Sequence, residues 1–414
     1  MKILHIAPIK IGRVSDEDTL DIFPGMQADG PTRSVLGLSL GLCDWECEVG
    51  VLSTRPLTEE AIRHFGGIKM LTPIAAQAKT PYISAVGWVD AIESEFGKPD
   101  LVNFHDVYDF AQCAIAREIK RRGWIYTVTP RGGLRKIPQK RSFLKKKLAN
   151  MLFFSQFLRN AAFITALCAA EKQDIAEFDS QLTDIIVAPN GIAESVVNGY
   201  SEMARKTDSD TPLMLGYIGQ FDVEIKGLDL LFGAFRRLKN EGRLQNVKLV
   251  LAGQFKARNK KMARQSQDEV ASFIHEMAES GHLEMKGPVF GNNKWSMLAD
   301  MDVFVLTSRT EGMPVAVLEA MAFQRPCLVT EGTNMAQFVA DHDAGWACET
   351  TAEAIYWQLR NVLATARSDM KKKGKNAQDA VRGTYLWPLS AKLYLDGVTR
   401  ILSQSGVEPR FNSK

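Results

Sequence analysis

Two glutamates separated by seven residues form the most chemically suggestive pattern in the chain. Glu311 follows a predicted strand, and Glu319 lies about five residues inside the apolar helix that Gly312, Met313 and Pro314 open. Burying a carboxylate costs several kcal/mol unless a partner compensates it. Carboxylates so placed could bind vicinal hydroxyls, one pair on a sugar ring and one on a ribose. A capping acid and a core salt bridge would explain the same pattern structurally.

Two glycine-containing turns could approach a phosphate. Gly30 and Pro31 open a predicted helix, whose first N–H groups and positive end suit an anion or a sugar oxygen. In the second turn, Gln220 follows a predicted strand and Lys226 precedes Gly227 at the mouth of a helix. A lysine there can meet a diphosphate as a point charge, or it can be a solvated loop residue.

His105 and Arg131 each follow a predicted strand in the first half of the chain. His105 ends the strand at 100–105, and Arg131 lies in Pro130-Arg131-Gly132 after the strand at 125–129. Ligands of open α/β sheets bind beyond the carboxyl ends of the strands, so both residues are predicted site residues. A lone histidine is elsewhere more often structural.

The sequence predicts no metal site. It contains no HExxH or CxxC motif, and its Asp-x-Asp pairs lie in polar loops or next to ordinary elements. These pairs are Asp16/Asp18, Asp208/Asp210, Asp300/Asp302 and Asp341/Asp343.

Alternating apolar runs and amphipathic stretches predict an α/β fold with two Rossmann-like domains facing each other across a cleft. The first-half strands are predicted at 2–8, 47–53, 67–72, 100–105, 125–129, 162–167 and 185–188. The second-half strands are predicted at 213–219, 247–252, 283–286, 302–307, 326–330 and 345–348. The segments at 9–29 and 256–267 are predicted to be loops, and a helix is predicted at 268–280. The predicted domains span 1–198 and 199–385, and a C-terminal helix with a tail follows at 386–414.

Composition is that of an ordinary globular protein. The 414 residues carry a net charge of only +3, so nucleic acid is not an expected partner. Six scattered cysteines lack metal-ligand spacing and are predicted to be reduced thiols, typical of a cytoplasmic protein. No leader and no membrane span are expected.

The distribution of charge is uneven. Thirteen Lys or Arg and one acid lie between Arg117 and Arg159. Lysines at 145–147 precede Leu148, Met151 and Leu152, a pattern that suits an anionic membrane surface. A helix with a solvated basic face and an apolar core face fits equally well. The predicted location is cytoplasmic, with peripheral attachment to the inner face of the plasma membrane as an alternative.

These motifs, in this order, resemble family 4 glycosyltransferases, retaining enzymes with the GT-B fold. Glu311 and Glu319 match the family's E-x7-E motif, and Lys226-Gly227-Leu228-Asp229 its KGxD segment. The family's N-terminal glycine loop, the end of its first domain and its C-terminal segment are matched by the segments at 30–34, 187–192 and 387–402. The resemblance covers nearly the whole chain and implies that the domain at 1–198 binds the acceptor and the domain at 199–385 binds the nucleotide sugar. The run at 130–132 is similar to a subgroup with Pro-Arg-Gly in place of the usual His-Gly.

The resemblance implies a metal-independent transfer of a hexose-type sugar from a UDP- or GDP-linked donor to a glycan or lipid-linked acceptor, in polysaccharide or lipopolysaccharide synthesis. It implies that Glu319 binds the donor ribose, Glu311 a sugar hydroxyl and Lys226 the diphosphate. Gln220 departs from the family's usual Arg, and Arg131 does not inherit the role of the usual His. The departures leave open a non-catalytic nucleotide-sugar- or partner-binding protein, and a hydrolase, epimerase or phosphorylase of the same fold is a further alternative.

Overall fold

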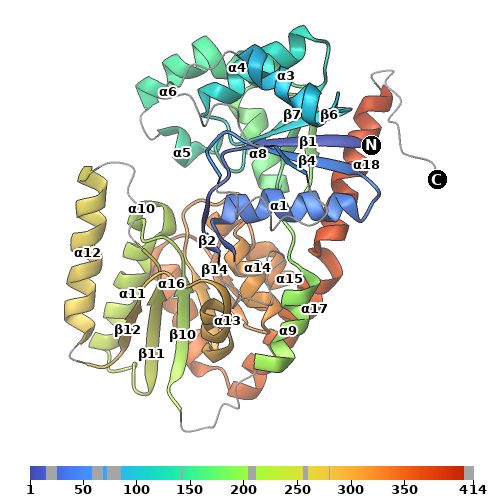
Figure 1. The fold of residues 1–414 in the computed structure, drawn as a ribbon. Coiled ribbons are helices and arrows are strands. Elements are labelled where there is room, and N and C mark those ends of the chain that lie inside the picture. Colours follow the sequence, from blue (N-terminus) through green and yellow to red (C-terminus); the bar gives the residue numbers. More distant parts are fainter. Residues whose placement is uncertain are drawn as a thin grey trace. The chain divides into compact units, whose positions relative to one another are not determined.

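The computed structural model describes residues 1–14, 26–57, 69–71, 85–140, 143–203, 211–254, 260–278 and 280–404. Contacts divide the chain into two compact units (Figure 1). Of the described residues, 1–14, 26–191 and 385–404 form unit 1, and Ile192–Thr384 belongs to unit 2. The chain thus leaves unit 1 after Gly191 and returns to it at Tyr385.

Unit 1 is built on a parallel sheet of seven described strands in the order β5-β4-β1-β6-β7-β8-β9. The strands are β1 (Lys2–Ala7), β4 (Glu48–Ser53), β5 (Lys69–Leu71), β6 (Leu101–His105), β7 (Tyr126–Thr129), β8 (Ile164–Ala166) and β9 (Ile185–Val187). Strands β4 and β5 lie on one side of β1, whereas β6 and its successors lie on the other. The order therefore reverses between β1 and β6, which is where open α/β sheets bind ligands.

Helices cover both faces of this sheet, with α1 on one face and α3 and α4 on the opposite one (Figure 1). The helical segments of unit 1 are α1 (Gly30–Cys43), α3 (Ala85–Glu95), α4 (Phe110–Arg121), α5 (Lys136–Lys140), α6 (Phe143–Ala149), the π-helical η2 (Asn150–Phe154), α7 (Ser155–Arg159), α8 (Ala169–Phe178) and α18 (Trp387–Gln404). Asp29 and Asp109 cap α1 and α4 by accepting from the amides of Thr32 and Ala111.

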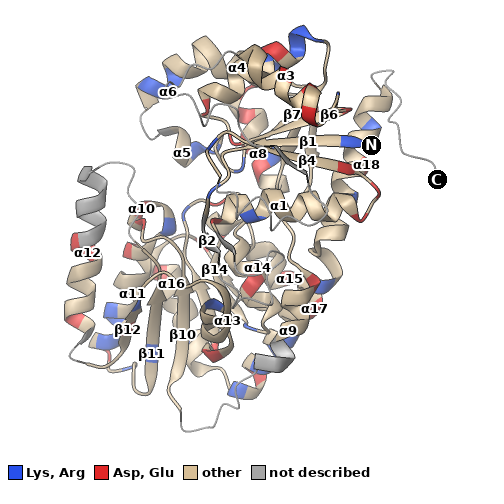
Figure 2. Ribbon diagram, in the orientation of Figure 1, with Lys and Arg blue, Asp and Glu red and all other residues tan. Residues whose placement is uncertain are grey.

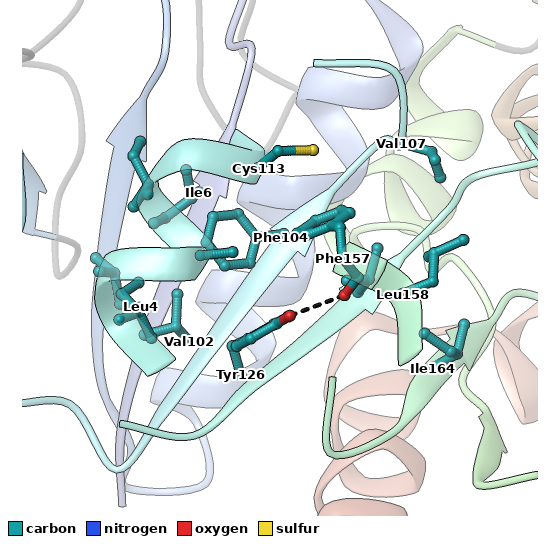
Figure 3. Close-up of a cluster of buried hydrophobic side chains, with 14 of the residues drawn as sticks. Leu4, Ile6, Val102, Phe104, Val107, Cys113, Tyr126, Phe157, Leu158 and Ile164 are labelled. Atoms are coloured by element: carbon teal, nitrogen blue, oxygen red, sulfur yellow. Dashed lines mark hydrogen bonds between the residues drawn. The ribbon is translucent and has the colours of Figure 1, made fainter. Parts of the chain in front are cut away.

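Side chains of β1, β6 and β7 pack against α4 and α7 in a continuous apolar core (Figure 3). Phe104 lies edge-on to both Tyr126 and Phe157, at centroid distances of 5.5 Å. The Tyr126 hydroxyl, buried by this packing, donates to the backbone oxygen of Phe157 at 2.8 Å. The buried Tyr126 hydroxyl thus has a hydrogen-bond partner. The core fixes the sheet in which His105 ends strand β6.

The C-terminal helix α18 packs on α1 within unit 1. Gly37 and Gly41, one turn apart on α1, provide the space: a Cβ at Gly37 would lie 2.1 Å from Cε2 of Trp387, and one at Gly41 would lie 2.5 Å from its backbone oxygen. Only glycine allows so close an approach. The predicted return of the C-terminal segment to the first domain is thereby confirmed.

Unit 2 is built on a parallel sheet of six described strands in the order β12-β11-β10-β13-β14-β15. The strands are β10 (Leu213–Ile218), β11 (Val247–Ala252), β12 (Leu283–Lys286), β13 (Val303–Leu306), β14 (Cys327–Thr330) and β15 (Gly345–Cys348). The helices are α9 (Glu194–Met203), α10 (Val223–Lys226), α11 (Leu228–Asn240), α12 (Lys260–Ala278), α13 (Gly291–Asp300), α14 (Val315–Ala322), the 3-10 turn η3 (Glu331–Thr333), α15 (Ala336–Asp341), α16 (Ala352–Ala364) and α17 (Arg367–Thr384). Its order reverses between β10 and β13.

Every predicted strand is present, and the α/β class is confirmed, but some local predictions were wrong. Within the predicted loop Ile9–Asp29, the described part holds a small antiparallel pair, β2 (Ile11–Val14) and β3 (Met26–Ala28); residues 15–25 lie outside the described residues. The basic segment predicted as a loop at 256–267 is helical from Lys260, where α12 begins. The few apolar residues of this segment give no clear helical period, whereas the helix predicted at 268–280 is present and ends at residue 278.

Candidate active site

Lys226 and Glu311 meet at the reversal point of the second sheet. Lys226 ends the loop and short helix that follow β10, and Glu311 lies in the loop after β13, the neighbouring strand. The Lys226 Nζ lies 2.6 Å from Glu311 Oε1, and the Ser308 hydroxyl donates to the same oxygen at 2.6 Å. Both charged side chains are only partly buried, at 20% and 14% exposure. The geometry places a cation and a carboxylate where such sheets bind ligands.

A glycine and an arginine hold this arrangement. Gly227 adopts φ +59° between α10 and α11, and a Cβ there would lie 2.1 Å from the Thr307 oxygen. Arg309 makes two hydrogen bonds to Asp229, with Nη1 at 2.6 Å from Oδ1 and Nη2 at 2.5 Å from Oδ2. Because Arg309 is two residues from Glu311 and Asp229 three from Lys226, this bidentate pair joins the two loops. Sequence reasoning named Asp229 only as part of a motif and missed Arg309, its partner.

The segment after Glu311 is pinned from the next strand. Asn334, in a left-handed conformation after β14, donates its amide to the backbone oxygens of Glu311 and Gly312, each at 2.7 Å. Met313 is buried, and Pro314 occupies the N-cap position of α14. Gly312 and Met313 thus lie just before the positive end of a helix, as the sequence predicted.

Glu319 is buried in α14, and its partner comes from α13. Lys294 Nζ lies 2.7 Å from Glu319 Oε1, and the two side chains are 7% and 8% exposed. Lys294 also lies over the Trp295 ring, 3.8 Å from its centroid. The pair compensates the burial of both charges. Lys294 is not part of any recognisable motif, and a strand lies between it and Glu319 in the chain. The sequence therefore gave no indication that Lys294 pairs with Glu319.

Gln220, in contrast, contributes no side chain to this cluster in the described contacts. It is exposed, and its backbone oxygen accepts a hydrogen bond from the Tyr217 hydroxyl at 2.7 Å. The structure therefore brings together Lys226, Glu311, Gly312 and Met313, places Glu319 on the following helix with Lys294, and leaves Gln220 on the surface of the loop.

A second group of polar residues lies at the carboxyl edge of the first sheet. His105, at the end of β6, contacts His5 of β1, with 2.9 Å between His105 Nε2 and His5 Nδ1. Arg131, which follows β7, donates from Nε to His105 Nδ1 at 3.2 Å and from Nη1 to Asn190 at 3.4 Å. Because Arg131 donates to Nδ1, the neutral His105 ring carries its proton on Nε2 and donates to His5.

Burial and the guanidinium together keep both histidines neutral. Burial, followed by the charge of Arg131, lowers the pKa of His5 to about 3. The same causes, with a further contribution from His5, lower the pKa of His105 well below its usual value. Burial lowers the pKa of Arg131 to about 10, so that it remains charged near neutrality. The cluster therefore carries one positive charge, on Arg131.

Glu171 fixes the turn that carries Arg131. Its carboxylate is fully buried and accepts from the backbone amides of Gly132 and Leu167, the latter at 2.7 Å. Burial raises the pKa of Glu171, against the lowering effect of those amides. Arg131 itself has φ +50°, a left-handed conformation that costs a non-glycine residue energy and persists only where contacts impose it. These contacts hold the turn in the conformation that places the Arg131 guanidinium against His105 and Asn190.

Gly30 begins α1, and a Cβ there would meet nothing within 4 Å. Asp29 already accepts from the Thr32 amide at 3.1 Å, and Pro31 has no N–H. This helix end consequently offers a ligand fewer amides than the glycine turn suggested. As for metals, the described residues contain no group of three or more His, Cys, Asp or Glu able to hold an ion.

Two Rossmann-like sheets and a C-terminal helix that returns to the first unit are the architecture of the GT-B fold. Two family models match consecutive parts of the chain: Glycosyltransferase Family 4 at residues 28–196 and Glycosyl transferases group 1 at residues 201–379. The chain belongs to this family, glycosyltransferase family 4 of group 1. The family and fold predicted from the motifs are confirmed.

One curated relative is WcaL of Escherichia coli K12, a glycosyltransferase assigned to colanic acid biosynthesis. It is 28% identical to this chain over 178 residues. The match spans 41% of this chain and 41% of that relative. The Salmonella typhimurium WcaL is 31% identical over 33% of this chain and 32% of its own length. The chain thus matches well under half the length of these relatives.

Solved structures show the fold over nearly the whole chain. Sucrose-phosphate synthase from Thermosynechococcus elongatus has a TM-score of 0.72 at 16% identity, covering 98% of this chain and 100% of that one. Anabaena HepE, solved with UDP-glucose, has a TM-score of 0.67 at 15% identity, covering 97% and 100%. WaaG, a glycosyltransferase involved in lipopolysaccharide biosynthesis, has a TM-score of 0.61 at 14% identity, covering 94% and 98%.

Proposed function

We propose that the protein transfers a hexose-type sugar from a nucleotide-diphosphate sugar to a hydroxyl of a glycan or lipid-linked acceptor, with retention at the anomeric carbon and without a metal ion. The observation that carries this proposal is the Lys226–Glu311 pair at the reversal point of the second sheet, with its ammonium 2.6 Å from the carboxylate. A donor needs a cation for its diphosphate and an acceptor of hydrogen bonds for its sugar, and these two side chains supply both.

In this proposal Lys226 binds the diphosphate. An ammonium group has three donors, so Lys226 can keep its bond to Glu311 and still donate to phosphate oxygens. Glu311, held by Lys226 and Ser308, accepts from a hydroxyl of the donor sugar. Arg309 is a positioning residue, because its bidentate bond to Asp229 sets the distance between the two loops.

Glu319 is proposed to accept from the donor ribose, with Lys294 orienting and compensating its buried carboxylate. The Gly312 and Met313 backbone, ahead of the positive end of α14, is proposed to lie close to the sugar and Pro314 to set the start of that helix. Gly30 and Gln220 are also proposed to bind the donor. At Gln220 the backbone is proposed to do so rather than the side chain, because the Tyr217 hydroxyl holds the backbone oxygen in place.

The transfer breaks the bond between the anomeric carbon and the β-phosphate oxygen, and the nucleoside diphosphate leaves with the bonding electrons. The acceptor hydroxyl attacks the resulting oxocarbenium-like carbon from the face the diphosphate vacates, and its proton passes to the departing diphosphate. Lys226 and helix N-termini stabilise the negative charge that develops. Glu311 is not proposed as a nucleophile, because its Oε1 is already held by two donors.

Arg131 is proposed as a second cation of the reaction, for the donor phosphate or sugar. His105 is 1% exposed and both its ring nitrogens are engaged, by His5 and by Arg131. We therefore propose His105 as a positioning residue for Arg131, in place of the direct catalytic role that the sequence suggested.

The donor and the pathway are proposed from similar proteins. HepE was solved with UDP-glucose, which supports a UDP-linked donor, with a GDP-linked one as the other candidate. The WcaL relatives are assigned to colanic acid biosynthesis and WaaG to lipopolysaccharide biosynthesis. Synthesis of a bacterial surface polysaccharide or lipopolysaccharide is the proposed role.

The test combines thermal shift and turnover with UDP-, GDP-, ADP- and CMP-sugars, with EDTA present. Lys226→Ala and Glu311→Gln should abolish the donor-induced rise in melting temperature, whereas Lys371→Ala, an exposed lysine on α17, should keep it. Arg309→Lys should bind donor but lower kcat/KM by about tenfold, because one guanidinium bond is worth about 1–2 kcal/mol.

If no nucleotide sugar raises the melting temperature of the wild-type protein, the donor assignment of Lys226 and Glu311 fails. If a donor binds and is never turned over with any acceptor fraction, the non-catalytic binding function replaces transfer. Free sugar as the product in place of a glycoside would show hydrolysis instead.

A further inference from the structure

Five large apolar side chains stand in solvent on a single short stretch of unit 1. Phe143, Leu144 and Leu148 of α6 and Met151 and Leu152 of η2 are all at least 50% exposed, and Leu144 reaches 78%. These five residues, the α6–η2 apolar surface, account for nearly half of the large exposed hydrophobics among the described residues. Scattered exposed apolar residues are normal, but a contiguous group marks an interaction surface.

The same stretch carries an excess of positive charge. No Asp or Glu occurs between Glu118 and Glu171, and Figure 2 shows basic but no acidic positions along α6. Lys145 and Lys147 of α6 are exposed. Leu144 and Leu148 are four residues apart and share one face of α6, so Lys145 and Lys147 lie to either side of that face. Among the described residues, neither lysine has an acidic side chain within ion-pairing distance.

The other cations nearby are already compensated, which separates them from this surface. Arg135 pairs with Asp174 and Arg159 with Asp179, each at 2.7 Å. Lys146 donates to the backbone oxygen of Pro138 and lies 4.8 Å from the centroid of the Tyr108 ring. These contacts anchor the stretch to unit 1. Lys147, in contrast, lies over an apolar side chain of the surface itself, with Nζ 6.0 Å from the centroid of the Phe143 ring. Lys140 has no described side chain, and Arg141 lies outside the described residues.

The packing behind the stretch explains why its apolar side chains remain outside. Phe110 of α4 packs edge-on against Phe153 and also contacts Phe154, and Phe154 lies edge-on to Tyr108. The core is thus closed by Phe153 and Phe154, and α6 projects at the periphery of the unit, away from the sheet (Figure 1). The surface is consequently presented on a rigid base.

A cavity of about 630 Å³ opens beside this surface and combines both chemistries in its walls. Phe143, Met151 and Phe178 contribute apolar groups, and Lys146 and Lys147 contribute ammonium groups. The two acids that also line the cavity are ion-paired, Glu177 to Lys136 and Asp179 to Arg159. Apolar and cationic walls side by side suit a phospholipid, with its acyl chains and its phosphate.

We propose that the α6–η2 apolar surface inserts into an anionic phospholipid bilayer, with Lys145 and Lys147 at the level of the headgroups. The partner follows from the charge and from the adjacent cavity. A bilayer interface offers acyl chains to the leucines and phosphates to the lysines, and the cavity has apolar and cationic walls side by side. Within the described residues no helix is long and apolar enough to cross a bilayer, so the contact is interfacial.

Co-sedimentation of the full chain with vesicles tests this proposal without any donor or acceptor, so its outcome is independent of the proposed reaction. Phosphatidylcholine vesicles are compared with vesicles that also contain phosphatidylglycerol, at low and high salt. We expect stronger retention on the anionic vesicles and release by salt. Each lysine at an anionic surface contributes about fivefold to binding, so Lys145→Glu with Lys147→Glu should weaken it at least about 25-fold.

The matched control is Lys371→Glu with Lys372→Glu, which changes two exposed lysines of α17 in the other unit and should leave binding unchanged. Leu144→Ser with Leu148→Ser should reduce binding while all charges remain. Leu144→Trp should show quenching by brominated acyl chains beyond that of the wild-type protein. Circular dichroism establishes that each variant is folded.

Equal retention on neutral and anionic vesicles, or equal loss in the α6 and α17 lysine variants, would overturn the proposal. Retention that depends on the lysines but not on Leu144 and Leu148 would also overturn it, because it would show adsorption by charge without insertion.

Discussion

The buried pair Lys294–Glu319 allows stability and donor binding to be separated. Glu319→Leu keeps the volume of the side chain but removes the carboxylate 2.7 Å from Lys294 Nζ, at a place where both side chains are less than 10% exposed. Removing one partner of a buried pair costs about 3–5 kcal/mol, because the other charge stays buried without compensation. Lys294→Met should cost a similar amount. The loss is a large part of a domain stability of about 5–15 kcal/mol.

The double variant Lys294→Met/Glu319→Leu should recover most of this loss, since replacing a whole buried ion pair by apolar residues is commonly neutral or stabilising. Donor binding should follow a different pattern. Glu319→Leu and the double variant should both lose the donor-induced rise in melting temperature, whereas Lys294→Met retains the carboxylate and should keep part of it.

Urea unfolding followed by hydrogen exchange and mass spectrometry measures this cycle, because peptides of unit 1 and unit 2 are then scored separately and unit 1 serves as the internal reference. Single substitutions that cost less than about 1 kcal/mol would show that the pair is not buried as described. A double variant that still responds to donor would refute the ribose-binding role of Glu319.

Two further predictions concern unit 1. Gly37→Leu should destabilise unit 1 by several kcal/mol, because the new Cβ would lie 2.1 Å from the Trp387 ring. Gly30→Ala should be nearly neutral, since a Cβ at Gly30 would meet nothing within 4 Å. Thermal melts compare the two variants, and equal melting temperatures would contradict the α1–α18 packing. Acidification should also destabilise unit 1. The histidines of the unfolded chain titrate near pH 6.5, whereas burial lowers the folded pKa of His5 to about 3 and that of His105 well below its usual value. Below about pH 6.5 the unfolded state therefore binds more protons than the folded state, and the free energy of unfolding falls. The loss should reach about 2–3 kcal/mol at about pH 5.5, measured by urea unfolding, and His5→Gln should flatten the slope; an unchanged slope in that variant would contradict the assignment.

The sequence was sufficient for the secondary structure where periodicity is strong. The strand predicted at 213–219 is Leu213–Ile218, and that at 326–330 is Cys327–Thr330. Buried parallel strands are short apolar runs bounded by turns, and this pattern needs no tertiary information. Prediction was poor in the polar segments: the residues of β2 and the first eight residues of α12 were expected in loops, because their few apolar residues gave no clear period.

The candidate site likewise contains residues that the sequence could identify and residues that it could not. Glu311, Glu319 and Lys226 could be found from the sequence, since each lies at a fixed offset from a recognisable strand, glycine or helix start. Lys294, Arg309 and His5 could not. Each acquires its role only from a partner distant in the chain, which is Glu319 for Lys294, Asp229 for Arg309 and His105 for His5. For Lys294 the burial of Glu319, a property of the packed structure, makes charge compensation necessary.

The sequence by itself therefore determined which elements form, which family the chain resembles and which strand ends carry charged residues. Only the tertiary structure decided how those residues act: that Lys226 reaches Glu311, that His105 is closed off behind Arg131, and that the leucines of α6 remain in solvent. Local periodicity and motif spacing are properties of neighbouring residues. Charge compensation and exposure depend on which elements pack together, and residues far apart in the chain decide them.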